Sequence, residues 1–413
     1  MKVWILTAIL GTFLTAESQQ LFSEETESVG HLPTFYNLEK DNGIYLSVDF
    51  LEWYARESNL SYSARSLGIQ KSPPFSGPPV NIGEQIALGV QDFEELDAAW
   101  DPGFRVKIGK DFGKKGLDVG LNWTYYHNTS DQSVSVPNFG VADGNPIFPI
   151  PFNPFYPSVG ESVLINPWSN LFFNGLDGFS SLFDVISAHW ALNFNQGDLE
   201  FGSKFWLSKA LALRVYGGVR GDWIKLTFNT VSSRDFTFVT SNESFLYLDR
   251  FTTHFWGVGP LGGIQPSWYI SKEFSIFSNL SGALLAGWFN LKKHENYTHT
   301  SSDLSVLGNT ILRPYEFINH SKNAFFQIQA VLDLSLGIRW ERNWSEDRYR
   351  STIDLGWENH IFFDTNHRSK LAGYSHPGIY MAGQTLLESN STYFEAIGNL
   401  ELGGLVASFK LDF

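Results

Sequence analysis

Residues 324–340, AFFQIQAVLDLSLGIRW, show the pattern that decides the fold. From Phe326 onward every second residue is apolar, and the positions between include amide, carboxylate, hydroxyl and guanidinium groups. Because successive side chains of a strand point to opposite faces, one face is continuously apolar and the other is mostly polar. A strand of a soluble sheet usually has about five or six residues, and this alternation is far longer. It therefore predicts a tilted strand that crosses a bilayer, with lipid on one face and water on the other.

The bulk composition excludes several other classes of protein. Mean hydropathy is −0.14, and no 18-residue apolar run follows the N-terminus, so a helical membrane protein is excluded. A barrel remains compatible because only alternate residues of its strands meet lipid. The chain of 413 residues has no cysteine, which removes disulfides, thiol nucleophiles and thiolate metal sites. Its net charge of −14 argues against nucleic acid as a partner, since binding phosphates needs a basic face.

The first residues, MKVWILTAILGTFLTAES, have the features of an export signal. Lys2 supplies a positive charge, residues 3–13 form an apolar core, and Ala16-Glu17-Ser18 is a small-x-small cleavage site. We expect residues 1–18 to be a cleavable N-terminal signal peptide. Residues 19–42 are polar and acidic, and we expect them to form a lead-in on the periplasmic side.

The same alternation recurs through residues 43–413, which we expect to form one barrel. In one stretch, for example, Trp190 and Phe194 alternate with His189 and Asn193. The clearest stretches are 43–54, 104–111, 117–125, 187–207, 211–220, 254–270, 274–291, 324–340, 353–358 and 398–413. Short polar turns alternate with long interruptions, as in a barrel with short periplasmic turns. The sequence thus predicts an all-β fold, a transmembrane antiparallel up-and-down β-barrel of 10–16 strands.

Long interruptions separate these stretches, and we expect them to be loops. They fall at about 57–99, 128–183, 292–323 and 364–397. The first two hold many prolines, which cannot donate hydrogen bonds within a sheet. The loop 128–183 also holds many aromatic residues, and a long ordered loop is usually functional. It either packs on the barrel rim or folds into the lumen and narrows it.

Two sets of side chains follow from the strand pattern. Tryptophans that alternate with polar residues or flank short turns are candidates for the aromatic girdles at the lipid boundary. They are Trp123, Trp206, Trp268, Trp340 and Trp357. Charged residues on the polar faces are candidates for lining a pore, because Arg or Lys facing lipid at the midplane costs about 2–4 kcal/mol. They are Arg105, Lys107, Arg214, Arg220, Asp222, Asp333, Arg339 and Asp354.

Three blocks of sequence resemble a known family. They are GIYLSVDFLEWYARESNLSYS (43–63), WDPGFRVKIGKDFGKKGLDVGLNWTYYH (100–127) and the final GNLELGGLVASFKLDF. Together they resemble the major outer membrane protein-like porins of chlamydia-related bacteria and the related Legionella pore-forming family. The resemblance implies a porin in the outer membrane of a Gram-negative-type bacterium. It also implies that the terminal Phe413 is the aromatic signal presented to the barrel assembly machinery. Disulfide cross-linking of the chlamydial type does not carry over, because cysteine is absent.

The sequence therefore predicts passive diffusion of small hydrophilic solutes and ions through a water-filled lumen, in which the inward charges would filter solutes. The alternative is that these charges pair with one another and fill a narrow, closed barrel. We expect no enzyme, because G-x-S-x-G and H-E-x-x-H motifs are absent, and we expect no cofactor and no metal. A barrel-type outer-membrane protease or lipid hydrolase and a surface adhesin or antigen remain alternatives. Expected partners are outer-membrane lipid, the assembly machinery and solutes, and a homo-oligomer is left open.

Overall fold

The computed structural model describes residues 43–71, 75–77, 80–82, 86–112, 116–137, 162–169, 182–238, 241–301, 306–307, 310–311, 315–344, 348–376 and 388–413. Among these, no helix is long and apolar enough to cross a membrane. The expected signal peptide (1–18), the lead-in (19–42) and the proline-rich centre of the loop 128–183 lie outside the described residues.

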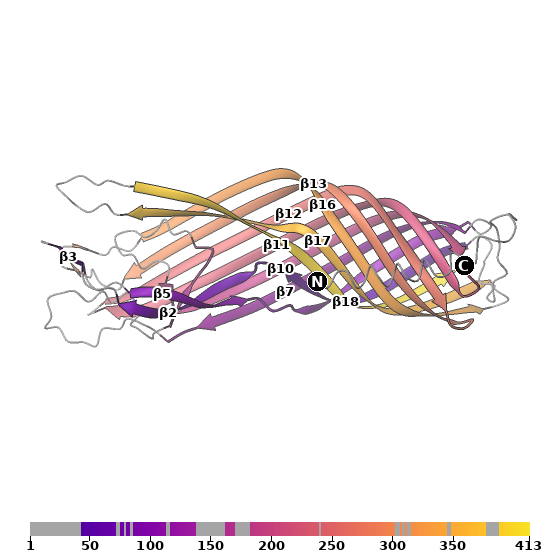
Figure 1. The fold of residues 1–413 in the computed structure, drawn as a ribbon, viewed down its shortest axis with the longest axis horizontal. Coiled ribbons are helices and arrows are strands. Elements are labelled where there is room, and N and C mark those ends of the chain that lie inside the picture. Colours follow the sequence, from indigo (N-terminus) through magenta and orange to yellow (C-terminus); the bar gives the residue numbers. More distant parts are fainter. Residues whose placement is uncertain are drawn as a thin grey trace, which may run out of the picture.

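Ten antiparallel strands close into one barrel (Figure 1). They are β1 (Gly43–Glu57), β6 (Trp100–Asp111), β7 (Leu117–Ser135), β10 (Val185–Trp206), β11 (Leu211–Phe238), β12 (Ser241–Tyr269), β13 (Phe274–Ser301), β16 (Tyr315–Trp344), β17 (Tyr349–His376) and β18 (Glu388–Asp412). Their order around the barrel is β1-β18-β17-β16-β13-β12-β11-β10-β7-β6, and β6 pairs with β1 to close it. The predicted fold class is confirmed, with the strand number at the lower end of the range 10–16.

The stretch 324–340 lies within β16 and shows why the sheet closes. Ile328 and Leu336 point outward and are 63% and 60% exposed, whereas Gln329 and Asp333 point inward and are buried. Lipid offers no hydrogen-bond partners, so the backbone groups at the edges of an open sheet would stay unpaired in a bilayer. A closed barrel has no edges, and it therefore pairs all backbone groups of its strands while it exposes an apolar outer face to lipid. The alternation in the sequence thus corresponds to the two faces of the barrel wall.

The two ends of the barrel differ in their connections. At one end the turns are short, and Ser208 and Ser271 each accept a hydrogen bond from the backbone N–H three residues later, at 3.1 Å. Ile44 and Phe413 exchange two backbone hydrogen bonds of 2.9 Å, so the described ends of the chain meet at this short-turn end. By the general rule for such barrels it is the periplasmic end.

At the long-loop end the predicted loop boundaries are wrong, because strands extend into all four ranges. β13 continues to Ser301 and β16 starts at Tyr315 within 292–323, while β17 and β18 form a hairpin within 364–397. On the outer face of β13 the polar Lys292, His294 and Asn296 replace apolar residues, so the apolar alternation fades although pairing continues. A second sheet forms within 57–99 and 128–183 from β2 (Ser61–Lys71), β5 (Ile86–Glu95), β8 (Ser162–Ile165) and β9 (Leu182–Phe183). Two small two-stranded sheets are formed by β3 (Phe75–Gly77) with β4 (Val80–Ile82) within 57–99, and by β14 (Val306–Leu307) with β15 (Thr310–Ile311) within 292–323.

One barrel strand leaves the wall near the long-loop end. Pairing of β17 with β16 ends at Phe362 opposite Val331, although both strands continue. The register of β17 with β18 then shifts, and Asp364 adopts a left-handed backbone conformation with φ 54°. Residues 365–368 are all buried, at 0–5% exposure, whereas a wall strand buries alternate residues. This part of β17 therefore lies across the barrel mouth.

Candidate functional site: the barrel interior

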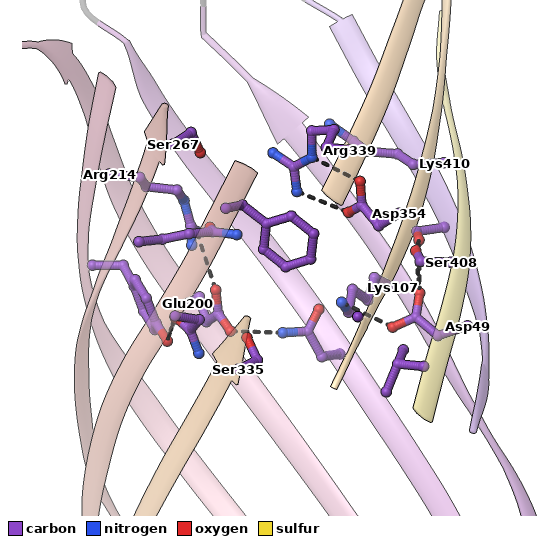
Figure 2. Close-up of a pocket in the computed structure, with 18 of the residues that line it drawn as sticks. Asp49, Lys107, Glu200, Arg214, Ser267, Ser335, Arg339, Asp354, Ser408 and Lys410 are labelled. Carbon is purple, nitrogen blue, oxygen red and sulfur yellow. Dashed lines mark hydrogen bonds and ion pairs between the residues drawn. The ribbon is translucent and has the colours of Figure 1, made fainter. Parts of the chain in front are cut away.

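The short-turn half of the interior is a polar chamber. It contains a cavity of about 310 Å³, whose charged lining residues come from strands all around the wall (Figure 2). Arg339 makes a bidentate pair with Asp354, with both N–O distances 2.8 Å. Arg214 contacts Asp118 at 2.6 Å and Glu200 at 3.1 Å. The chamber thus offers solutes charged groups of both signs.

A chain of ion pairs crosses the lumen, and all of its members line the cavity of the chamber. On one side Lys107 contacts Asp49 at 2.9 Å, and Asp49 contacts Arg105 at 3.3 Å. Arg105 makes a bidentate pair with Glu358, with its shorter distance 2.7 Å. His360 contacts Glu358 at 3.3 Å and Asp333 at 2.8 Å. Arg220 then contacts Asp333 at 2.7 Å and, on the other side of the lumen, Asp198 at 2.8 Å.

This chain joins strands on opposite sides of the barrel. Arg105 on β6 reaches Glu358 on β17, and Arg220 on β11 reaches Asp333 on β16. Each pair spans three steps in the strand order. Buried charges of this kind are tolerated only when they are paired and hydrogen-bonded. Their pairing therefore determines which parts of the lumen stay open.

All eight charged residues predicted to face the interior do so. Seven line the cavity, namely Arg105, Lys107, Arg214, Arg220, Asp333, Arg339 and Asp354. Asp222 lies deeper, is 0% exposed, and neither of its carboxylate oxygens accepts a hydrogen bond from a described residue. It sits on β11 between Arg220 and the apolar Ile224, where the polar chamber ends.

The next layer of the interior is apolar and fills the lumen. Phe194 on β10 and Phe362 on β17 lie 5.4 Å apart between ring centroids, and these two strands are diametrically opposite in the barrel order. Both rings are at most 1% exposed. We call this the apolar plug, formed by Leu51, Trp53, Tyr126, Leu192, Phe194, Leu226, Phe255, Leu285, Phe289, Phe362, Leu400 and Leu402. In this conformation the plug separates the polar chamber from the long-loop end.

The plug also corrects the orientation of one stretch. By the rule used for 324–340, the apolar Trp190, Leu192 and Phe194 would face lipid and His189 and Asn193 would face water inside. The structure shows the reverse: the three apolar side chains are at most 2% exposed inside the barrel. The prediction is wrong here because alternation distinguishes the two faces of a strand but does not say which face is inside.

Beyond the plug, a second polar cluster closes the barrel mouth. Arg368 from the inward part of β17 contacts Glu57 at 3.4 Å, and its guanidinium lies 4.0 Å from the ring centroid of Phe228. Trp168 donates its indole N–H to the Ser61 carbonyl at 2.7 Å, and its own carbonyl accepts from Lys293 at 3.2 Å. Residues 162–169 of the loop 128–183 thus dock onto the mouth, while the centre of this loop lies outside the described residues.

Four of the five tryptophans predicted for the girdles lie on the outer face. Trp123, Trp268 and Trp357 are 47%, 60% and 39% exposed, and Trp340 is partly exposed and donates to Glu273 at 3.1 Å. Trp206 was wrongly assigned: it lines the cavity and packs on Tyr269, with ring centroids 5.1 Å apart. Being next to a turn does not decide which face a side chain occupies, and the position of Trp206 along its strand places it inside.

The residues that determine how far the lumen is open could not be identified from the sequence pattern alone. The plug aromatics and the acidic partners Asp49, Asp198 and Glu358 come from separate strands, so only closure of the barrel brings them together. The alternation along β1 was a usable signal, because it places Asp49 on the same face of the strand as Leu51 and Trp53. The described residues contain no group of three or more His, Asp or Glu arranged to hold a metal ion.

Comparison with solved structures finds other outer-membrane barrels. The outer membrane protease OmpT from Escherichia coli is 9% identical, with a TM-score of 0.34 over 94% of this chain and 99% of that chain. A Pseudomonas aeruginosa FadL homologue is 8% identical, with a TM-score of 0.20 over 90% of each chain. These likenesses are too weak to transfer an activity. No curated protein matches the chain.

The family assignment comes from the sequence itself. The pattern of the family described as Legionella pneumophila major outer membrane protein precursor matches residues 42–407, which covers nearly the whole barrel. The expected resemblance and the expected location are thereby confirmed. The chain belongs to this family and is a β-barrel protein of the outer membrane.

Proposed function

We propose that the protein is a porin, that small hydrophilic solutes and ions pass through its lumen, and that the structure is the closed channel. The polar chamber of about 310 Å³ supports this most directly. A barrel that had only to be rigid could fill this half with packed apolar side chains, as it does in the other half. Buried ion pairs are often no more stable than such packing, so a charged chamber implies a role for water-soluble species.

The apolar plug determines how such a channel operates. An apolar constriction blocks ions because water leaves it, and it conducts once it widens and becomes wet. Here the opposite walls meet through the Phe194 and Phe362 rings. Opening therefore requires these rings to separate, and β17 is the strand best placed to move because its pairing with β16 stops at Phe362.

Planar bilayer recordings test this proposal. We expect small or infrequent conductance steps from the wild-type protein and severalfold larger mean current from the double variant F194A/F362A, because the ring contact across the lumen is removed. The matched control is F326A, whose ring is 54% exposed on the outer face and should leave the current unchanged.

Each outcome has a defined meaning. Silent bilayers for both the wild type and F194A/F362A would overturn the porin proposal and leave a closed barrel. A large wild-type current that F194A/F362A does not change would place the constriction elsewhere and overturn the gating role of the plug. We propose no catalytic activity, and no observation on the described residues favours the enzyme or adhesin alternatives over the channel.

A further inference from the structure

A basic patch covers the outer face of β11, β12, β13 and β16 on the long-loop side of the lipid-facing aromatic residues. The aromatic row consists of Trp223, Trp256, Trp288 and Phe326, which are direct neighbours across the four strands and are 50–55% exposed. The next three outward rows contain the patch. Its basic residues are Lys225, Arg250, His254, Lys292, His294, His320 and Lys322.

The charge of this patch is opposite to that of the whole chain. The chain carries −14, yet none of the twelve outward positions in these three rows is Asp or Glu. The first acidic residue further along β16 is Glu316, which accepts a hydrogen bond from Asn296 at 3.0 Å. No described acidic residue forms an ion pair with Lys225, Lys292 or Lys322. The positive charge is therefore not neutralised by the protein part that the structure describes.

Cross-strand pairing within the patch brings positively charged side chains next to one another. Lys292 lies directly opposite Lys322, and Lys225 directly opposite His254. His294 and His320 are also opposite, with their ring centroids 4.4 Å apart, and their Nδ1 atoms share a hydrogen bond of 2.9 Å, so at most one of these two rings is protonated. Like charges directly opposite one another destabilise a sheet. Among the described residues no carboxylate pairs with Lys292 or Lys322, so a bound anion is the simplest source of compensation for this like-charged pair.

The position of the patch indicates which anion it is. A groove of about 320 Å³ runs from the apolar Trp256 and Trp288 to the polar His254, Asn290 and Lys292. A ligand in this groove would have an apolar part against the tryptophans and a negative part against the lysines. The outer face of a barrel at this height meets the lipid headgroups of the leaflet on the long-loop side.

We propose that the basic patch binds a phosphate-bearing lipid headgroup of the outer leaflet, with the acyl chains lying along the row of Trp223, Trp256, Trp288 and Phe326. Lys292 and Lys322 contact the phosphate, and Lys225 and Arg250 flank it. The site is on the lipid face of the barrel wall and does not depend on whether the lumen conducts.

The test uses the full-length protein in dodecyl maltoside micelles and bisphosphorylated lipid A as the probe, with binding followed by native mass spectrometry. We expect the double variant K292Q/K322Q to bind lipid A about 30-fold more weakly, since each lysine near an anionic surface contributes roughly 1 kcal/mol. The variant K292R/K322R should retain binding. The control K272Q/R342Q removes two exposed charges at the short-turn end and should bind as the wild type does.

Three results would overturn the proposal. The first is equal affinity of K292Q/K322Q and the wild type for lipid A. The second is equal affinity of the wild type for lipid A from which the phosphates have been removed. The third is displacement of lipid A by millimolar inorganic phosphate, which would indicate a site for free phosphate. Heat-modifiable gel mobility without added lipid verifies that each variant is folded, and unchanged bilayer currents of K292Q/K322Q would separate this site from the channel.

Discussion

The two halves of the barrel interior are built by the same strands and differ completely in chemistry. On β1 the inward side chains change from Ser47 and Asp49 to Leu51 and Trp53 within one strand. On β11 they change from Arg220 and Asp222 to Ile224. At this change the outer face is still apolar, with Phe50 on β1 and Trp223 on β11 both exposed. The difference shows that barrel formation constrains the outer face, whereas the inner face is free to be a charged chamber in one half and an apolar plug in the other.

Removing a charge from the chamber should have the largest effect on stability. Arg220 is 4% exposed and holds Asp198 and Asp333, so R220M would leave these carboxylates in a buried site without their main partner. We expect a loss of about 3–5 kcal/mol in the free energy of unfolding. Urea unfolding in lipid vesicles, followed by tryptophan fluorescence, measures it.

The double variant R220M/D198N supplies the control for this prediction: it also neutralises one of the two carboxylates that R220M would leave without Arg220, so it should cost less than R220M alone. The exposed change K272M should cost almost nothing. If R220M were as stable as K272M, the chain of ion pairs across the lumen would not contribute to the free energy of unfolding. The contrast in chemistry between the two halves of the interior would then have no counterpart in stability.

Truncating a ring of the plug should cost somewhat less. F362A removes a fully buried aromatic side chain that touches the opposite wall, and we expect a loss of about 3 kcal/mol in the free energy of unfolding. The same vesicle assay applies. F326A removes a ring of equal size from the lipid face and should change stability little, because acyl chains refill the space. Equal losses for both variants would contradict the packing of the plug.

The smallest effect is expected at the mouth, where the loop 128–183 docks. W168F keeps most of the ring but loses the indole N–H that donates to the Ser61 carbonyl at 2.7 Å. We expect a loss of about 1 kcal/mol. Limited proteolysis of folded protein should also cleave near residues 162–169 faster in W168F than in wild type. An unchanged cleavage rate would show that this hydrogen bond does not hold the segment on the mouth.

The sequence by itself determined the barrel. The alternation in 324–340 and in other strands is local, and a bilayer accepts only a closed sheet with an apolar outside, so fold class, short turns and the inward placement of all eight predicted charges followed. The match to the family over residues 42–407 and the outward placement of Trp123, Trp268, Trp340 and Trp357 were visible in the same way.

Tertiary structure alone decided what the interior contains. Phe194 and Phe362 are 168 positions apart in the chain and meet only because β10 and β17 face each other across the closed barrel. The same holds for Arg105 with Glu358 and for the row that aligns Lys292 with Lys322. Alternation has a period of two and is identical for inward and outward faces, so it could not show that Trp206 points inside or that an apolar layer crosses the lumen.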